Sequence, residues 1–155
     1  MAFVADHEIL FGRLDEELRS ARKAAPDVFY KIIACVCRRI PVLLKTGNAT
    51  RIDQLIGAGA WTDGALALLQ LELPEWQVRR LAFENGEWLC SLSRQPNLPA
   101  TLDDSIDVVH AVLPLAILRA FLEAQQASRA AGQILADVAR LQPTIGHPIC
   151  CDNFA

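Results

Sequence analysis

Two apolar segments on either side of Asn85-Gly86 constrain the fold of this chain more than any other feature of its sequence. Asn-Gly is the dipeptide that best fits the two-residue type I′ turn of a β-hairpin, because both turn residues need positive φ angles. Residues 76–84 and 87–94 show the alternating pattern of half-buried strands. The sequence therefore predicts an antiparallel hairpin over about residues 76–94.

The turn also fixes the register of this hairpin, because a slip by one residue would turn every side chain to the other face. The expected pairs are Glu84 with Glu87, Phe83 with Trp88, Leu81 with Cys90, and Arg79 with Leu92. One face is then apolar and the other polar. A two-stranded ribbon is marginally stable alone. Its apolar face is therefore expected to lie on helices of the same chain, and the alternative is that a free edge pairs with another chain.

Helical periodicity dominates the rest of the chain. A stripe of mostly apolar residues recurs at spacings of four and three from His7 to Ala25, as in an amphipathic helix, and Pro26 either ends this helix or opens the next. A second helix is expected over residues 27–45, interrupted near residue 40 by Pro41. Shorter helices follow Thr50 and Thr62. The expected fold class is thus mainly α (α+β), a helical bundle of about five or six helices with one antiparallel two-stranded β-hairpin, in one domain over residues 1–155.

The last helical pattern is unusually long. Asp103 or Asp104 is expected to cap a helical region that continues to Leu141. Unbroken, this region would be about 58 Å long, so Pro114 or Gly132 is expected to kink or divide it. Beyond Pro114 an apolar stripe has small residues in its middle, and periodicity leaves open whether the stripe packs on the same chain or on a second subunit. The stripe consists of Ile117, Phe121, Ala124, Ser128, Ala131, Leu135, Val138 and Gln142.

Composition excludes several classes of protein. The formal net charge of −3 and the short basic pairs argue against a nucleic-acid partner. The chain has no apolar run of the roughly 20 residues that a membrane span needs, and its first residues do not resemble a signal peptide. We therefore expect a cytoplasmic protein. Its five cysteines, an odd number, suggest thiols rather than a disulfide framework, and residues 143–155 are a candidate flexible tail.

Two groups of residues are candidates for metal binding. Asp103, Asp107 and His110 are spaced by four and three, which would place them on one face of a continuous helix. The alternative is that these acids only cap the start of a helix, where the helix dipole stabilises negative charge. His147, Cys150 and Cys151 form the second group, although zinc sites usually have two spaced pairs of ligands. No signature of a nucleophile or of a phosphate-binding loop is present, and no cofactor is predicted.

The middle of the chain resembles a group of small alphaproteobacterial proteins that have no assigned activity. The resemblance implies a bacterial cytosolic protein and carries over no catalytic residue. The segments that carry it are Trp61-Thr62-Asp63, Leu71-Glu72-Leu73-Pro74-Glu75-Trp76, Arg79-Arg80-Leu81, Asn85-Gly86-Glu87-Trp88, Ser91-Leu92-Ser93-Arg94-Gln95-Pro96 and Leu113-Pro114-Leu115-Ala116-Ile117-Leu118.

Three functional hypotheses follow from these patterns. The leading one is a non-enzymatic helical protein that acts through association, as a homodimer or with another protein partner, using the last helix or the hairpin edge. The second is a carrier or enzyme that holds a small molecule between helices, where many ligand pockets lie. Its polar groups would be Asp107, His110, and Arg79 or Arg80. The third is a metal-dependent enzyme that uses one of the two candidate metal groups.

Overall fold

The computed structural model describes residues 2–45 and 50–141 of the chain. Within these residues six helices accompany one three-stranded antiparallel sheet, whose strand order is β1-β2-β3. The elements in chain order are α1 (Ala2–Ser20), α2 (Pro26–Val36), α3 (Ile40–Lys45), α4 (Thr50–Gly57), α5 (Trp61–Glu72), β1 (Gln77–Glu84), β2 (Glu87–Ser93), β3 (Ile106–His110) and α6 (Leu113–Leu141).

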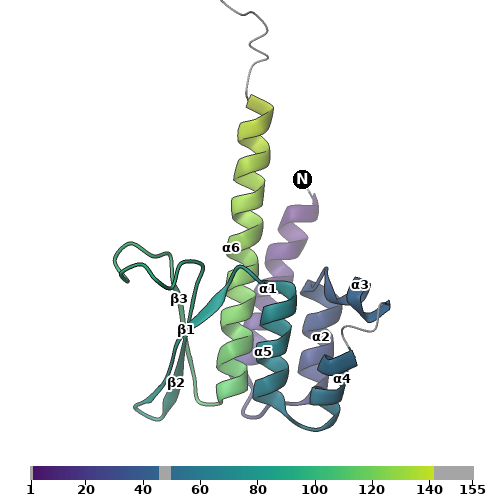
Figure 1. Ribbon diagram of the computed structural model, residues 1–155. Helices are drawn as coiled ribbons and strands as arrows, with labels where there is room; N and C mark the ends of the chain where they lie inside the picture. The colour runs from purple at the N-terminus through teal and green to yellow at the C-terminus, as the bar shows by residue number, and fades with distance from the viewer. Residues whose placement is uncertain (1, 46–49, 142–155) are drawn as a thin grey trace, which may run out of the picture.

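Helix α6 lies between the sheet and the other helices (Figure 1). Its first half contacts β2 and β3 on one side and α1 and α5 on the other. Leu115, Ile117 and Phe121 in this half are completely buried, and they belong to a core that also includes Phe29 and Leu68 from α2 and α5. Two polar side chains of α6 extend this packing, because Gln125 and Arg129 both donate hydrogen bonds to the carbonyl oxygen of Val36 at the end of α2.

The hairpin forms at its predicted turn. Asn85 and Gly86 have the positive φ angles of 55° and 85° that a type I′ turn needs. Glu84 pairs with Glu87, and the predicted register continues from there along most of β1. The Asn-Gly signal was sufficient here because turn geometry and strand alternation are both local properties of the sequence.

The prediction of a two-stranded hairpin is wrong, because residues 106–110 form a third strand. β3 pairs antiparallel with β2, with Val108 opposite Cys90 and Ile106 opposite Leu92. The acids around residue 103 indicate the start of a helix, but Ile106, Val108 and Val109 are β-branched and suit a strand. Pairing with β2 gives the hairpin the support that two strands alone would lack.

The last helix begins at Leu113, ten residues after the predicted cap at Asp103. Pro114 lies in its first turn, where its missing N–H costs nothing, and Gly132 does not interrupt it. At 29 residues α6 is about 43 Å long. Despite this length, neither α6 nor any other helix among residues 2–45 and 50–141 is long and apolar enough to cross a membrane.

Two details of the hairpin differ from the prediction. A register shift between Val78 and Arg80 places Val78, and not Arg79, opposite Leu92. The end of the hairpin also diverges from α6 (Figure 1), so the helices cover its apolar face only in part. Cys90 is fully buried on this face, whereas Phe83 is 57% exposed and contacts Trp88 with their ring centroids 5.1 Å apart.

Candidate functional site: an apolar helix face between two grooves

The second half of α6 leaves the body of the protein and projects beyond α1 (Figure 1). Its large apolar side chains are therefore uncovered, and Leu135 and Leu141 are 71% and 79% exposed. Isolated apolar residues are common on protein surfaces, but a run of them along one helix marks an interaction surface. We call residues 131–141 the α6 tip. Its exposed large apolar residues are Ile134, Leu135, Val138 and Leu141.

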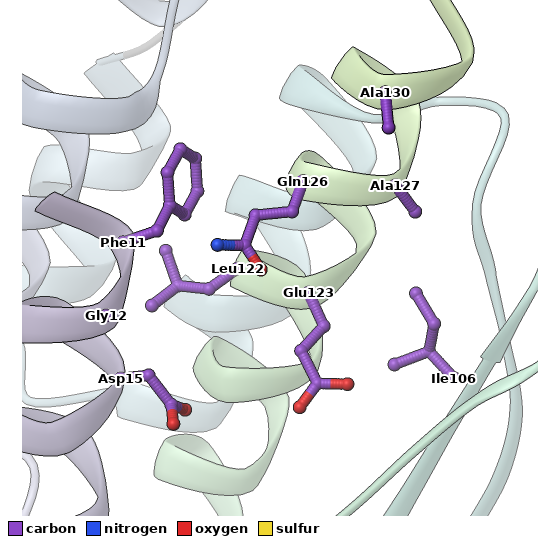
Figure 2. A pocket seen from close by; sticks show the side chains of 9 residues that line it. All are labelled: Phe11, Gly12, Asp15, Ile106, Leu122, Glu123, Gln126, Ala127 and Ala130. Carbon is purple, nitrogen blue, oxygen red and sulfur yellow. The ribbon is translucent and has the colours of Figure 1, made fainter. Parts of the chain in front are cut away.

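Below the α6 tip, a groove of about 570 Å³ lies between α1 and α6 (Figure 2). Phe11 of α1 and Leu122 of α6 give it apolar walls, and Ile106 at the start of β3 lies on its far side. The carboxylates of Asp15 and Glu123 point toward the same end of the groove (Figure 2). We call this space the α1–α6 groove. It is lined by Phe11, Gly12, Asp15, Ile106, Leu122, Glu123, Gln126, Ala127 and Ala130.

A buried arginine neutralises one of these carboxylates. Arg119 Nε donates a hydrogen bond of 2.8 Å to Asp15 Oδ1, and Arg119 Nη1 donates one of 2.9 Å to the carbonyl oxygen of Val109. Arg19 binds the other oxygen of Asp15 from the surface, with Nη2 at 2.9 Å from Oδ2. Arg119 thus joins α6, α1 and β3 beside the groove-lining Asp15.

Glu123 has a different electrostatic environment. Burial, and next the charge of Asp15, raise the pKa of the Glu123 carboxyl above its usual range, while Arg119 and Arg19 oppose this shift. Within the described residues no hydrogen bond or ion pair holds its side chain. The protonated form is therefore favoured by folding. Its contribution to stability is complete below the ordinary pKa of 4.5 and is lost as the pH rises through the higher folded-state pKa.

The variant Glu123→Gln tests this assignment. Because glutamine cannot ionise, we expect the variant to have a higher Tm than the wild-type protein at neutral pH. The difference should disappear when both are measured below the ordinary pKa of glutamate. Glu16→Gln, an exposed position on α1, is the matched control and should show no such dependence. Equal Tm values for Glu123→Gln and wild type at neutral pH would contradict the raised pKa.

A second groove, of about 470 Å³, lies on the other side of Ile106. Trp76 forms part of its wall, with its Nε1 donating a 2.9 Å hydrogen bond to Ser128 Oγ and the guanidinium of Arg94 stacked 4.7 Å from the ring centroid. Leu102, which is 72% exposed, lines its rim. We call this space the β3–α6 groove. Ile106 and Ala127 line both grooves, so the surface of α6 around the exposed Ala127 lies between them.

The residues chosen from the sequence as polar ligand groups do not converge on one site. Arg79 forms a 2.5 Å ion pair with Asp103 and donates to the carbonyl oxygen of Leu98, which fixes the segment before β3 to the start of β1. Arg80 is exposed and pairs with Glu84 at 2.6 Å. The structure therefore brings Arg79 and Asp103 together, and it places Arg80 elsewhere on the sheet.

Asp107 and His110 lie on opposite faces of β3, because side chains three residues apart in a strand point in opposite directions. Asp107 is exposed, whereas His110 is 7% exposed. Its Nε2 donates to the carbonyl oxygen of Leu18, and its Nδ1 accepts from the backbone N–H of Val112. The Nε2 bond thus holds β3 against α1, and the Nδ1 bond holds the turn between β3 and α6. The helical face predicted for Asp103, Asp107 and His110 does not form.

Among the residues that the structure describes, no group of three or more His, Cys, Asp or Glu side chains could hold a metal ion. His147, Cys150 and Cys151 lie outside the described residues. Cys35, Cys37 and Cys90 are free thiols. Burial, and then the charge of Asp107, raise the pKa of Cys90 to about 12, and burial raises the pKa of Cys37 even more. Such thiols behave as small apolar core residues.

Comparison with known proteins adds no identification: no family model matches the chain, and neither a curated protein nor a solved structure matches it. The resemblance to small alphaproteobacterial proteins stays a prediction. The case for function therefore depends on the geometry of the α6 tip and the two grooves.

The sequence contained the apolar stripe on α6 but not the grooves beside it. Ser128, and the stripe residues before it, pack within the chain, whereas Leu135 and Val138 are uncovered. Nothing in the sequence distinguishes Glu123 and Asp15 from other acidic residues on the polar face of a helix. Arg119 had one, because it is the only charged residue in the apolar run from Leu113 to Leu122.

Proposed function

We propose that this protein is a non-enzymatic cytoplasmic assembly protein that forms a homodimer by packing α6 against α6 of a second copy in antiparallel orientation. The observation that carries the proposal is the match between the α6 tip and the alanines below it. On one helix, the exposed Ala127 and the half-buried Ala131 line the grooves, and large exposed apolar residues follow at the same helical spacing.

The spacing of these residues defines the alignment. Positions 127, 131, 134, 138 and 141 recur at intervals of four and three, as in the seam of a coiled coil. An antiparallel alignment that puts Ala131 against Ile134 of the other copy also puts Ala127 against Val138. Each layer then joins one alanine with one large side chain, so the helices approach closely without leaving voids. The same contacts occur twice about the two-fold axis.

The area that a stable interface buries also indicates that the proposed dimer interface extends from the α6 tip into the two grooves. Such an interface buries at least about 1,200 Å² in total. The α6 tip alone is about 16 Å long, too short for two helices to bury that area. Overlap over residues 124–141 is about 27 Å long. It also lets side chains of the incoming tip enter the α1–α6 and β3–α6 grooves, where Ile106 and Leu102 add apolar contact.

The double variant Ile134→Gln/Val138→Gln tests the proposal. Both side chains are more than half exposed in one copy, so the variant should fold normally. In the proposed dimer it removes apolar burial at each of the two symmetric halves, and we expect the dimer dissociation constant to rise at least about 100-fold. Sedimentation equilibrium measures this change. Ala136→Gln/Ala139→Gln, on the opposite face of the α6 tip, is the matched control and should dimerise like wild type.

A second variant probes the groove side of the interface. Ala127→Leu fills the space that Val138 of the partner would occupy, although leucine is tolerated at this exposed helical position in one copy. It should also weaken association. Wild-type protein that remains monomeric at micromolar concentration would overturn the proposal. A native mass that exceeds one chain by the mass of a small molecule would likewise overturn it and place that molecule in a groove.

A further inference from the structure

The free edge of β1 is a second surface that the proposed α6 dimer does not use. β1 lies at one edge of the sheet and pairs only with β2 in it. In a hairpin closed by Glu84 and Glu87, alternate residues of β1 direct their backbone groups to β2. Leu81 and Phe83 direct theirs outward. Within the described residues, no backbone hydrogen bond joins either residue to another segment.

Within the described part of the chain, the beginning of this edge is better protected than the rest. Proteins usually guard an edge strand with a bulge, a proline, charged side chains or a covering loop. The register shift at Arg79 and the contacts of its side chain with Leu98 and Asp103 guard the beginning of β1. Among the residues that the structure describes, no bulge, proline or covering loop protects residues 80–84. Their two charged side chains, Arg80 and Glu84, have opposite signs, and Leu81 and Phe83 are 37% and 57% exposed on the apolar face of the sheet.

The side chains along residues 80–84 are complementary to those of a second copy of the same strand. If two β1 strands pair antiparallel with Ala82 opposite Ala82, Leu81 of each copy lies opposite Phe83 of the other. The same register puts Arg80 opposite Glu84, so each positive charge meets a negative one. Leu81 and Phe83 both face outward, so this register also aligns their backbone donors and acceptors.

Neighbouring registers lack this match. A shift must move the pairing by two residues to keep outward groups opposite each other. A shift of two residues in one direction places Leu81 of one copy opposite Leu81 of the other, and Arg80 opposite Ala82. Shifting the other way sets Phe83 opposite itself and leaves Glu84 opposite Ala82. Only the register centred on Ala82 pairs both charges and both apolar residues.

We propose that two copies of this protein join edge to edge through residues 80–84 of β1, centred on Ala82, to form one continuous sheet. The in-chain pair of Arg80 and Glu84 is then replaced by two pairs between copies, and Leu81 covers the exposed ring of Phe83. This contact is independent of the α6 dimer. A chain that has both two-fold surfaces builds assemblies larger than a dimer.

Charge reversal tests this register directly. Arg80→Glu and Glu84→Arg should each weaken edge pairing at least about 10-fold, because like charges then lie opposite each other twice in the dimer. Mixing the two single variants should restore association, because one copy then carries acids at both positions and the other carries arginines at both. The double variant Arg80→Glu/Glu84→Arg should also recover. Glu87→Arg changes the same charge one strand away from the edge and is the matched control.

All of these variants are made in the Ile134→Gln/Val138→Gln background, so that α6 contacts do not contribute to the measured mass. Sedimentation equilibrium and native mass spectrometry of the mixture report mixed dimers directly. If the Ile134→Gln/Val138→Gln protein without further changes stays monomeric at micromolar concentration, the edge proposal is overturned and the α6 proposal is not affected. Failure of the two single variants to associate on mixing would also overturn it. If the Ile134→Gln/Val138→Gln variant associates as tightly as the wild-type protein, the α6 proposal is contradicted and the edge proposal is not.

Discussion

Replacing Glu72 with glutamine is expected to lower the free energy of unfolding by about 3 kcal/mol, which corresponds to a fall in Tm of about 9 °C. Glu72 is 4% exposed at the end of α5. Its carboxylate accepts hydrogen bonds from the backbone N–H groups of Arg38, Arg39 and Ile40, with the shortest at 2.6 Å. These amides belong to the turn before α3 and to its first residue, and a helix leaves its first N–H groups without partners of its own.

The carboxylate is needed because it offers only acceptors. Glutamine keeps one acceptor oxygen, but its amide group would place donors against backbone donors, and hydrogen bonds to a charged acceptor are stronger than neutral ones. Chemical denaturation at one fixed protein concentration measures the loss, since self-association would otherwise shift the apparent stability. Glu75→Gln, an exposed position three residues away, is the matched control and should change stability by less than about 0.5 kcal/mol.

The parts of the fold that were predictable are those that local sequence determines. Asn85 and Gly86 determine the turn and the register near it. The break predicted near residue 40 is present, although α2 already ends at Val36 and Pro41 lies in the first turn of α3. Residues 106–110 were misassigned because the aspartates around them favour a helix start, whereas the strand depends on pairing with β2 across a loop. Long-range pairing of this kind is not visible in a local pattern.

The candidate site was only partly predictable for a related reason. The stripe on α6 was correct as a pattern, but periodicity does not reveal where the rest of the chain stops covering a helix. Phe83 illustrates the same point, since it lies on the predicted apolar face and yet extends past the helices that cover Cys90. Asp107 and His110 would share a face in a helix, but in the strand β3 they lie on opposite faces.

Removal of Arg119 should be the second large effect, with Arg119→Met lowering the free energy of unfolding by about 3 kcal/mol. The side chain of Arg119 is 10% exposed and that of Asp15 is 26% exposed. Methionine would leave the carboxylate with Arg19 as its remaining ion pair and the carbonyl oxygen of Val109 without its donor. Breaking this pair is costly because the half-buried Asp15 carboxylate then keeps only the exposed Arg19 as its counter-ion.

A double-mutant cycle separates this explanation from simple loss of packing. If the cost comes from the stranded charge of Asp15, then adding Asp15→Asn to Arg119→Met should recover part of the lost stability, with a coupling energy of at least about 1 kcal/mol. Arg19→Met is the matched control, because it removes a guanidinium from the same carboxylate at an exposed position and should cost less than about 1 kcal/mol. Strictly additive effects in the cycle would show instead that Arg119 stabilises the fold through packing of its aliphatic stem. The ion pair with Asp15 would then not contribute to the stability of the groove wall.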